Sequence, residues 1–208
     1  MNQISMQILG HIDMYDITDT TNVTKILDVD NAVHYENMSE AMAYSLADLG
    51  GNFIKTINLG NGGTSIDPTG VINYLPTNTN NQNAALYNQT FSKVIDGTSS
   101  ANLDPSNNKM EVRHIPGKVY TDILVTMLLD YGEPGANWDG KGAPGQAAFD
   151  NSQSLNEEYV FDELGLFSTA GKMLSHVVFH PVQKSLNRKI KIDYTIRIQS
   201  LTNLSAIV

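Results

Sequence analysis

Residues 186–198 read LNRKIKIDYTIRI, and the alternation of apolar and polar side chains in this stretch decides the fold class. Every second position from Ile190 to Ile198 is apolar, and the positions between them are charged or polar. A strand places alternate side chains on opposite faces, whereas a helix would spread the isoleucines around its circumference. The stretch therefore predicts a strand of an antiparallel sheet, packed on one face and solvated on the other.

Shorter alternating segments occur through most of the chain and predict further strands. Turn-forming residues separate them, which is typical of antiparallel folds. Leucines on both faces of residues 118–130 predict that this strand lies inside a sheet. The predicted strands cover residues 3–9, 12–17, 23–29, 53–59, 86–96, 110–115, 118–130, 157–167 and 172–182.

One segment, residues 31–49, predicts a helix. Met38, Met42, Leu46 and Leu49 recur at helical spacing, and Gly50-Gly51 follows as a stop signal. Either Asp28 or Asp30 is expected to cap the helix, and the methionines are expected to pack in the core.

The fold class predicted from these patterns is mainly β: an antiparallel β sandwich or jelly-roll-like fold with one helix. We expect residues 1–208 to form a single β-rich structural domain. The segments 61–108 and 131–156 are rich in Asn, Ser, Gly and Pro and are expected to be long loops. Loops of this length in a compact domain are often used for contacts.

The composition excludes several classes of protein. The net charge is −9 and the pI is about 4.8, so no surface for nucleic acid is expected. The chain has no cysteine, which excludes disulfides and thiolate chemistry. No apolar run reaches membrane-spanning length, and the N-terminus lacks the features of a secretory signal. We therefore expect use in a cytoplasm or in a particle assembled there.

The basic residues are concentrated towards the C-terminus. Two interpretations remain open: a solvated strand face, or a contact that complements an acidic surface on a neighbouring subunit. Under the second interpretation the candidate interface residues include Lys189, Lys191 and Arg197.

Trp138, the only tryptophan, lies in a Gly- and Pro-rich segment close to Tyr131. Trp138 is either a local packing residue or an interface anchor, and Tyr131 is a candidate interface residue beside it. With Tyr131, Asp130 and Asp139, it is also a candidate stacking platform for a sugar.

Motifs for catalysis or metal binding are weak. A glycine-rich turn at residues 60–63 follows a predicted strand, but no Lys-Ser or Lys-Thr pair follows it, so a phosphate loop is not expected. His176 and His180 would lie roughly 13 Å apart on a strand, too far to share a metal ion. We expect both to be structural histidines.

The adjacent carboxylates Asp162 and Glu163 are not expected to form an acid/base pair, because neighbours on a strand face opposite sides. One of them is expected to bond to a turn at Gly165. We therefore expect no enzyme activity, no cofactor and no metal.

Several segments together resemble a family of virion proteins of tailed bacteriophages. They are the helix at Asn31–Leu49 with its Gly-Gly stop, INLGNGGT at 57–64, DELGLFSTAGKML at 162–174, HVVFHPVQKS at 176–185 and the alternating terminal strand. The resemblance covers about Asn31 to Ser200 and implies a part of a phage particle. The short chain favours a compact ring, collar or decoration subunit over a fibre.

The expected function is a non-enzymatic structural subunit of a tailed phage virion, at the neck, collar or tail. Its partners would be copies of itself and other virion proteins, with no direct nucleic acid and no membrane. Residues 76–108 and the Trp138 segment are the candidate contact loops. The alternatives are a capsid decoration or fibre-base protein, a receptor- or glycan-binding β module, and a polysaccharide-degrading enzyme.

Overall fold

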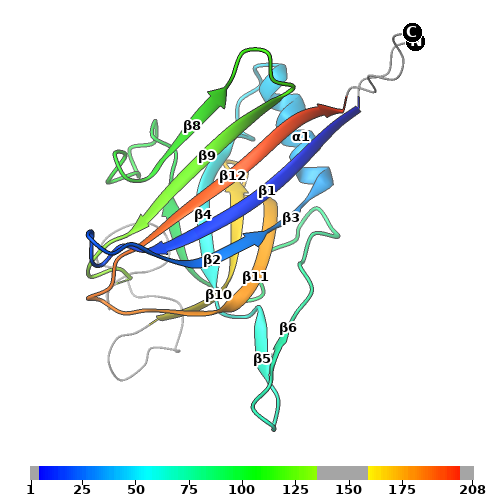
Figure 1. Cartoon of the computed structure of the whole chain (residues 1–208). Coiled ribbons are helices and arrows are strands. Elements are labelled where there is room, and N and C mark those ends of the chain that lie inside the picture. Colours follow the sequence, from blue (N-terminus) through cyan, green and yellow to red (C-terminus); the bar gives the residue numbers. More distant parts are fainter. Residues whose placement is uncertain (1–4, 135–158, 202–208) are drawn as a thin grey trace.

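The computed structural model describes residues 5–134 and 159–201, and it is a mainly β structure with a single short helix. Two five-stranded antiparallel sheets carry the core (Figure 1). The first sheet has the order β2-β1-β12-β9-β8, with bounds Thr24–Asp30, Ser5–Asp16, Ile190–Leu201, Tyr120–Leu129 and Lys109–His114. The second has the order β3-β11-β10-β4-β7, with bounds Ala32–Val33, Met173–Lys184, Tyr159–Ser168, Ile54–Gly60 and Gln89–Val94.

The alternating strand predicted at residues 186–198 is β12, and it is the central strand of the first sheet. It begins at Ile190 and pairs with β1 on one side and β9 on the other, with Ile192 opposite both Met14 and Met127. Ile190, Ile192 and Tyr194 are buried, while the residues between them are partly exposed. The predicted alternation is confirmed.

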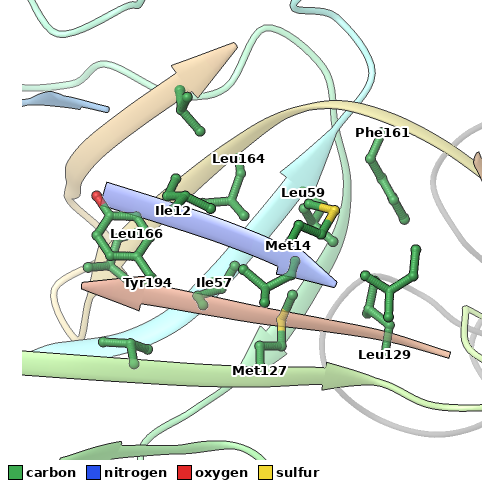
Figure 2. Close-up of a cluster of buried hydrophobic side chains, with 14 of the residues drawn as sticks. Ile12, Met14, Ile57, Leu59, Met127, Leu129, Phe161, Leu164, Leu166 and Tyr194 are labelled. Atoms are coloured by element: carbon green, nitrogen blue, oxygen red, sulfur yellow. The ribbon is translucent and has the colours of Figure 1, made fainter. Parts of the chain in front are cut away.

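Side chains from both sheets form one core, as expected for a β sandwich. Ile12, Met127 and Tyr194 come from the first sheet, and Leu59 and Leu164 come from the second (Figure 2). Tyr194 also links the sheets through a polar contact, because its hydroxyl donates to Ser175 Oγ on β11. Burial of large apolar side chains from both layers is the main stabilising term.

Several predicted boundaries are wrong. The two strands predicted at 3–9 and 12–17 are replaced by one strand, β1, which spans Ser5–Asp16. Gly165 lies inside β10 rather than in a turn, opposite His176 on β11. Gly165 is needed inside the strand because the side chains of Phe167 and Leu86 pack over its Cα atom. A Cβ atom on residue 165 would lie 2.8 Å from the Phe167 ring and 3.0 Å from Leu86.

The helix α1 spans Tyr35–Leu46 and is shorter than predicted at both ends. Its N-cap is His34, whose ring accepts a hydrogen bond from the Asn37 amide at 3.2 Å. Asp28 and Asp30 lie in β2 instead of capping it, since residues 32–33 form the edge strand β3 against β11.

Only the first part of the predicted apolar stripe packs. Met38 is buried and Met42 is partly buried, but Leu46 and Leu49 are exposed. Among the described residues, no helix has the length and apolar character needed to cross a membrane.

Candidate functional site

The feature that stands apart from the sandwich is a small hairpin formed by β5, Thr64–Ile66, and β6, Ile72–Tyr74. These strands form a two-stranded sheet of their own, which projects from one end of the sandwich (Figure 1). Asp67 orders the tip by accepting hydrogen bonds from the amides of Thr69 and Val71. We call residues 64–75 the hairpin arm.

The hairpin arm carries apolar side chains that the described chain leaves exposed. Thr64 pairs with Tyr74 and Ile66 pairs with Ile72, so these four side chains share one face. Ile66 is 72% exposed and Tyr74 is 53% exposed. A two-stranded hairpin is only marginally stable alone. Its position therefore depends on how its base is held.

Asp162, on β10, holds the first strand of the arm at its base. Its carboxylate accepts the Gly63 amide at 2.8 Å and the Thr64 amide at 2.9 Å, and it also accepts the Thr64 hydroxyl. On the other side of the arm, the Leu75 amide donates to the Gly63 carbonyl at 2.8 Å. The Tyr74 hydroxyl lies 3.2 Å from His180 Nδ1 on β11.

Glu163 holds the chain that enters the arm and the chain that returns from it. Its Oε1 accepts the amides of Gly62 at 3.2 Å and Asn88 at 2.8 Å. Its Oε2 accepts the Tyr87 amide at 2.9 Å. Hydrogen bonds to an ionised carboxylate are about twice as strong as neutral ones. We call Asp162 and Glu163 the carboxylate anchor.

Both carboxylates serve the same turn because β10 is irregular at this point. The pairing of β10 with β11 shifts register between Phe161, opposite Val182, and Glu163, opposite Val178. An irregularity of this kind redirects the side chains around it, as a β-bulge does. The expectation that Asp162 and Glu163 face opposite environments is therefore wrong: both are buried and both bond to residues 62–64.

The glycines of residues 60–63 are required by this close approach. A Cβ atom on Gly60 would lie 2.4 Å from the Asn88 carbonyl oxygen and 2.5 Å from Glu163 Oε1. On Gly63 it would lie 2.9 Å from the Asp162 carbonyl oxygen. Successive backbone amides in such a turn form a concave site for an anion. Here the anions are the chain's own carboxylates.

His176, on β11, completes the anchor. Its Nδ1 accepts the Asn78 amide at 2.8 Å, so the ring proton is on Nε2, which donates to Glu163 Oε2 at 3.0 Å. Burial raises the pKa of Glu163, but the hydrogen bonds from His176 and from the Asn88 and Tyr87 amides outweigh it and hold that pKa below its usual range. The structure thus supports the interpretation of His176 as a structural histidine.

Residues 76–88, which we call the strap, connect the arm to β7. They pass over the start of α1 and over β10 and β11. The Asn81 carbonyl accepts a hydrogen bond from His34 at 2.7 Å, and the Gln82 carbonyl accepts one from Asn37 at 3.2 Å. Ala84 and Leu86 pack on Phe167 and Met173, as a small cluster separate from the main core. Part of the predicted contact loop at 76–108 is therefore covered by its own chain.

The predicted basic interface residues are paired with acidic residues of their own chain. Lys191 Nζ lies 2.6 Å from Asp193, and Lys189 Nζ lies 2.9 Å from Asp130 and over the Tyr131 ring. Arg197 makes a two-pronged contact with Asp122 at 2.7 and 2.8 Å. These pairs fit a solvated strand face, and a role in subunit contacts stays a prediction.

The second predicted loop is described only at its start. Tyr131 is half-exposed and its hydroxyl donates to the Thr18 carbonyl at 3.1 Å. Trp138 and Asp139 lie outside the described residues. The interface role of Trp138 and the sugar platform therefore stay predictions.

A third cluster, on β1 and β2, has the spacing of metal ligands. One ligand atom from each of His11, Asp13 and Asp28 lies within 4.8 Å of the others. However, Lys25 Nζ lies 2.6 Å from Asp13 and 2.7 Å from Asp28, so an ammonium group already contacts both carboxylates and offsets part of their charge. The bond to Asp30 is the main cause that raises the pKa of His11, with Asp13 and Asp28 adding to it. We assign this cluster to a surface ion-pair network.

Sequence reasoning missed the anchor because its parts are far apart in the chain. The available signal was an acidic pair inside an otherwise apolar strand, YVFDELGLF, together with glycines that lack a phosphate-loop context. No family model matches the chain, and comparison with curated proteins and with solved structures finds no match.

Proposed function

We propose that the chain is a non-enzymatic structural subunit of a tailed-phage particle, at the neck, collar or tail, and that it assembles through the hairpin arm. The observation that carries the proposal is an exposed apolar arm with a fixed base. Exposed apolar patches on a compact protein mark interaction sites. An arm held in place before contact also loses less conformational entropy when it binds.

The polar groups that would suit catalysis are used to hold the arm. Asp162, Glu163 and His176 are at most 3% exposed, and their oxygens and nitrogens bond to backbone amides and to one another. General acid–base catalysis requires a group within hydrogen-bonding reach of a substrate. These three residues have no such access, which supports a structural role.

Three of the five segments that carry the resemblance to phage virion proteins meet at the base of the arm. The turn in INLGNGGT supplies the amides, DELGLF supplies the carboxylates and HVVFHP supplies His176 and His180. Segments that are far apart in the chain thus converge on one structural feature. This convergence supports the arm as the feature that these motifs serve.

The first experiment measures the mass of the purified protein by light scattering, with negative-stain images of the same fraction. We expect an oligomer, because a projecting apolar arm needs a partner surface. A closed ring of about six or twelve copies would fit a neck or collar, and a trimer would fit a fibre base or a decoration protein. A chain that stays monomeric at all concentrations would contradict self-assembly.

A second experiment tests the place in the particle. Mass spectrometry of purified phage particles that encode this chain should detect it in a fixed ratio to the other virion proteins. Detection in the infected-cell lysate but not in the particles would contradict the proposal.

A further inference from the structure

A groove of about 640 Å³ lies between α1 and the first half of β1. Met6 is 57% exposed and Tyr35 is 82% exposed, and Met42 is partly buried beside them. Methionine side chains adapt their shape to a partner, so they are common at binding surfaces. The floor is formed by Ile8, Val33 and Met38.

One wall of the groove is an unpaired strand edge. β1 pairs with β12 along its whole length, but β2 covers only His11–Asp16 of its other edge. Among the described residues, no strand pairs with that edge along residues 5–9, and at Gly10 the carbonyl accepts the Asn31 amide at 3.1 Å. An exposed edge can accept a strand from another chain through main-chain hydrogen bonds.

This edge lacks the charges that protect exposed strands. Natural edge strands carry charged side chains, which prevent pairing with other chains. The outer strand β8 carries Lys109, Glu111 and Arg113, and the outer strand β2 carries Lys25, Asp28 and Asp30. Residues 5–10, SMQILG, carry no charge.

The hairpin arm matches the groove in charge and in chemistry. The chain has a net charge of −9, so two copies repel each other overall, and a contact between nearly uncharged surfaces adds little to that repulsion. Residues 64–75 hold one charged residue, Asp67, and the groove lining holds one, Asp30. Among the residues that the structure describes, no strand pairs with the outer edges of the arm, and its apolar face carries Ile66, Ile72 and Tyr74.

The arm cannot fill the groove of its own chain, because it projects away from the end of the sandwich where α1 and the start of β1 lie (Figure 1). We propose that the hairpin arm of one copy docks into the α1–β1 groove of a second copy and adds a strand to the free edge of β1. This inference rests on the proposal that the arm serves assembly.

Such a contact joins two different surfaces, head to tail. Head-to-tail contacts form closed rings when the rotation between copies closes, and filaments when it does not. Each copy then gives one arm and receives one arm. This property makes the proposal testable with pairs of variants.

The test uses Ile66→Lys to disable the arm and Met6→Lys to disable the groove. Both side chains are exposed, and a lysine at a strand edge opposes pairing. Light scattering should show that each variant alone is a monomer. An equimolar mixture should give a dimer of twice the 22.8 kDa chain mass, because one intact arm meets one intact groove. Val112→Lys, on the exposed face of β8, should keep the wild-type oligomer.

Circular dichroism and thermal melting should show wild-type folding for every variant. Val71→Lys for the arm and Tyr35→Ala for the groove repeat the test if a first variant does not fold. A wild-type oligomer that survives Met6→Lys and Tyr35→Ala, or two monomeric variants that give no dimer on mixing, would overturn the groove as the partner and leave assembly through the arm in place. A monomeric wild-type protein would overturn both.

Discussion

The first sheet and the arm with its strap are held in place by different forces. β12 lies between β1 and β9, and its alternate side chains Ile190, Ile192 and Tyr194 are buried in a core shared by both sheets. The arm and the strap depend on the Asp162 and Glu163 carboxylates. These carboxylates accept hydrogen bonds from backbone amides at the base of the arm and at the end of the strap.

The core therefore determines the stability of the whole fold, whereas the carboxylate anchor determines the position of the arm and the strap. Packing in the core is spread over many side chains, so it stabilises the whole fold. The carboxylate anchor is concentrated in a few buried polar groups, so its loss frees one region and leaves the sandwich folded. Stability in proteins is commonly divided into such local units. The predictions below test this division, starting with the largest expected effect.

The same substitution should have very different effects in the two regions. Ile192→Ala removes a fully buried side chain at the centre of the core and should lower the free energy of unfolding by about 3–4 kcal/mol. Ile66→Ala removes an exposed side chain from the arm and should change it by less than about 0.5 kcal/mol. Urea unfolding followed by circular dichroism measures both, and equal losses would contradict the division.

Removing one charge from the anchor should release the strap. Glu163→Gln replaces two acceptor oxygens with one and places an NH₂ group against amide donors, so we expect a loss of about 2–3 kcal/mol. Limited proteolysis should then cut within residues 61–88 while the sandwich stays intact. Glu111→Gln, on a half-exposed surface pair, is the control and should leave both readouts unchanged.

The anchor should also weaken in acid. The folded pKa of Glu163 is below its ordinary value of 4.5, so its contribution is present above pH 4.5 and is lost as the pH falls through the folded pKa. The difference in unfolding free energy between the wild-type protein and Glu163→Gln should therefore narrow below pH 4.5. A difference that stays constant from pH 7 into the acid range would show that the charge of Glu163 does not hold the strap.

The glycine turn offers a steric test of the same contact. Gly60→Ala places a Cβ atom 2.4 Å from the Asn88 carbonyl oxygen and 2.5 Å from Glu163 Oε1 and should cost about 1–3 kcal/mol, because both the Asn88 backbone and the carboxylate must move. Gly97→Ala meets no atom within 4 Å and should stay within about 0.5 kcal/mol of the wild-type protein in the same urea titration. Equal values for the two variants would contradict a close-packed turn.

The smallest effect is expected at the basic residues of the first sheet. Lys191→Ala removes a surface ion pair with Asp193 and should change stability by about 0–1 kcal/mol. It should leave the oligomer mass unchanged if the pair acts only within the chain. A fall in mass on light scattering would instead place Lys191 in a subunit contact.

The sequence was sufficient for the core and insufficient for the site. The alternation at residues 190–198 depends on local strand geometry alone, so it predicts β12 and the buried face correctly. The anchor depends on a register shift between Phe161 and Glu163 and on amides about a hundred residues away, at 62–64. Spacing along the chain cannot place such groups together. The helix was predicted too long because the pairing of residues 32–33 with β11 overrides their helical pattern.

Hydrogen exchange, followed amide by amide, tests the carboxylate anchor most directly. In the wild-type protein, the Gly63, Thr64, Tyr87 and Asn88 amides should exchange slowly. In Glu163→Gln, Tyr87 and Asn88 should exchange almost as fast as in an unfolded chain, Gly63 and Thr64 on Asp162 should keep part of their protection, and β12 should stay strongly protected, losing no more than the fall in global stability. Fast exchange of Tyr87 and Asn88 in the wild-type protein, or fast exchange throughout β12 in Glu163→Gln, would contradict a local anchor.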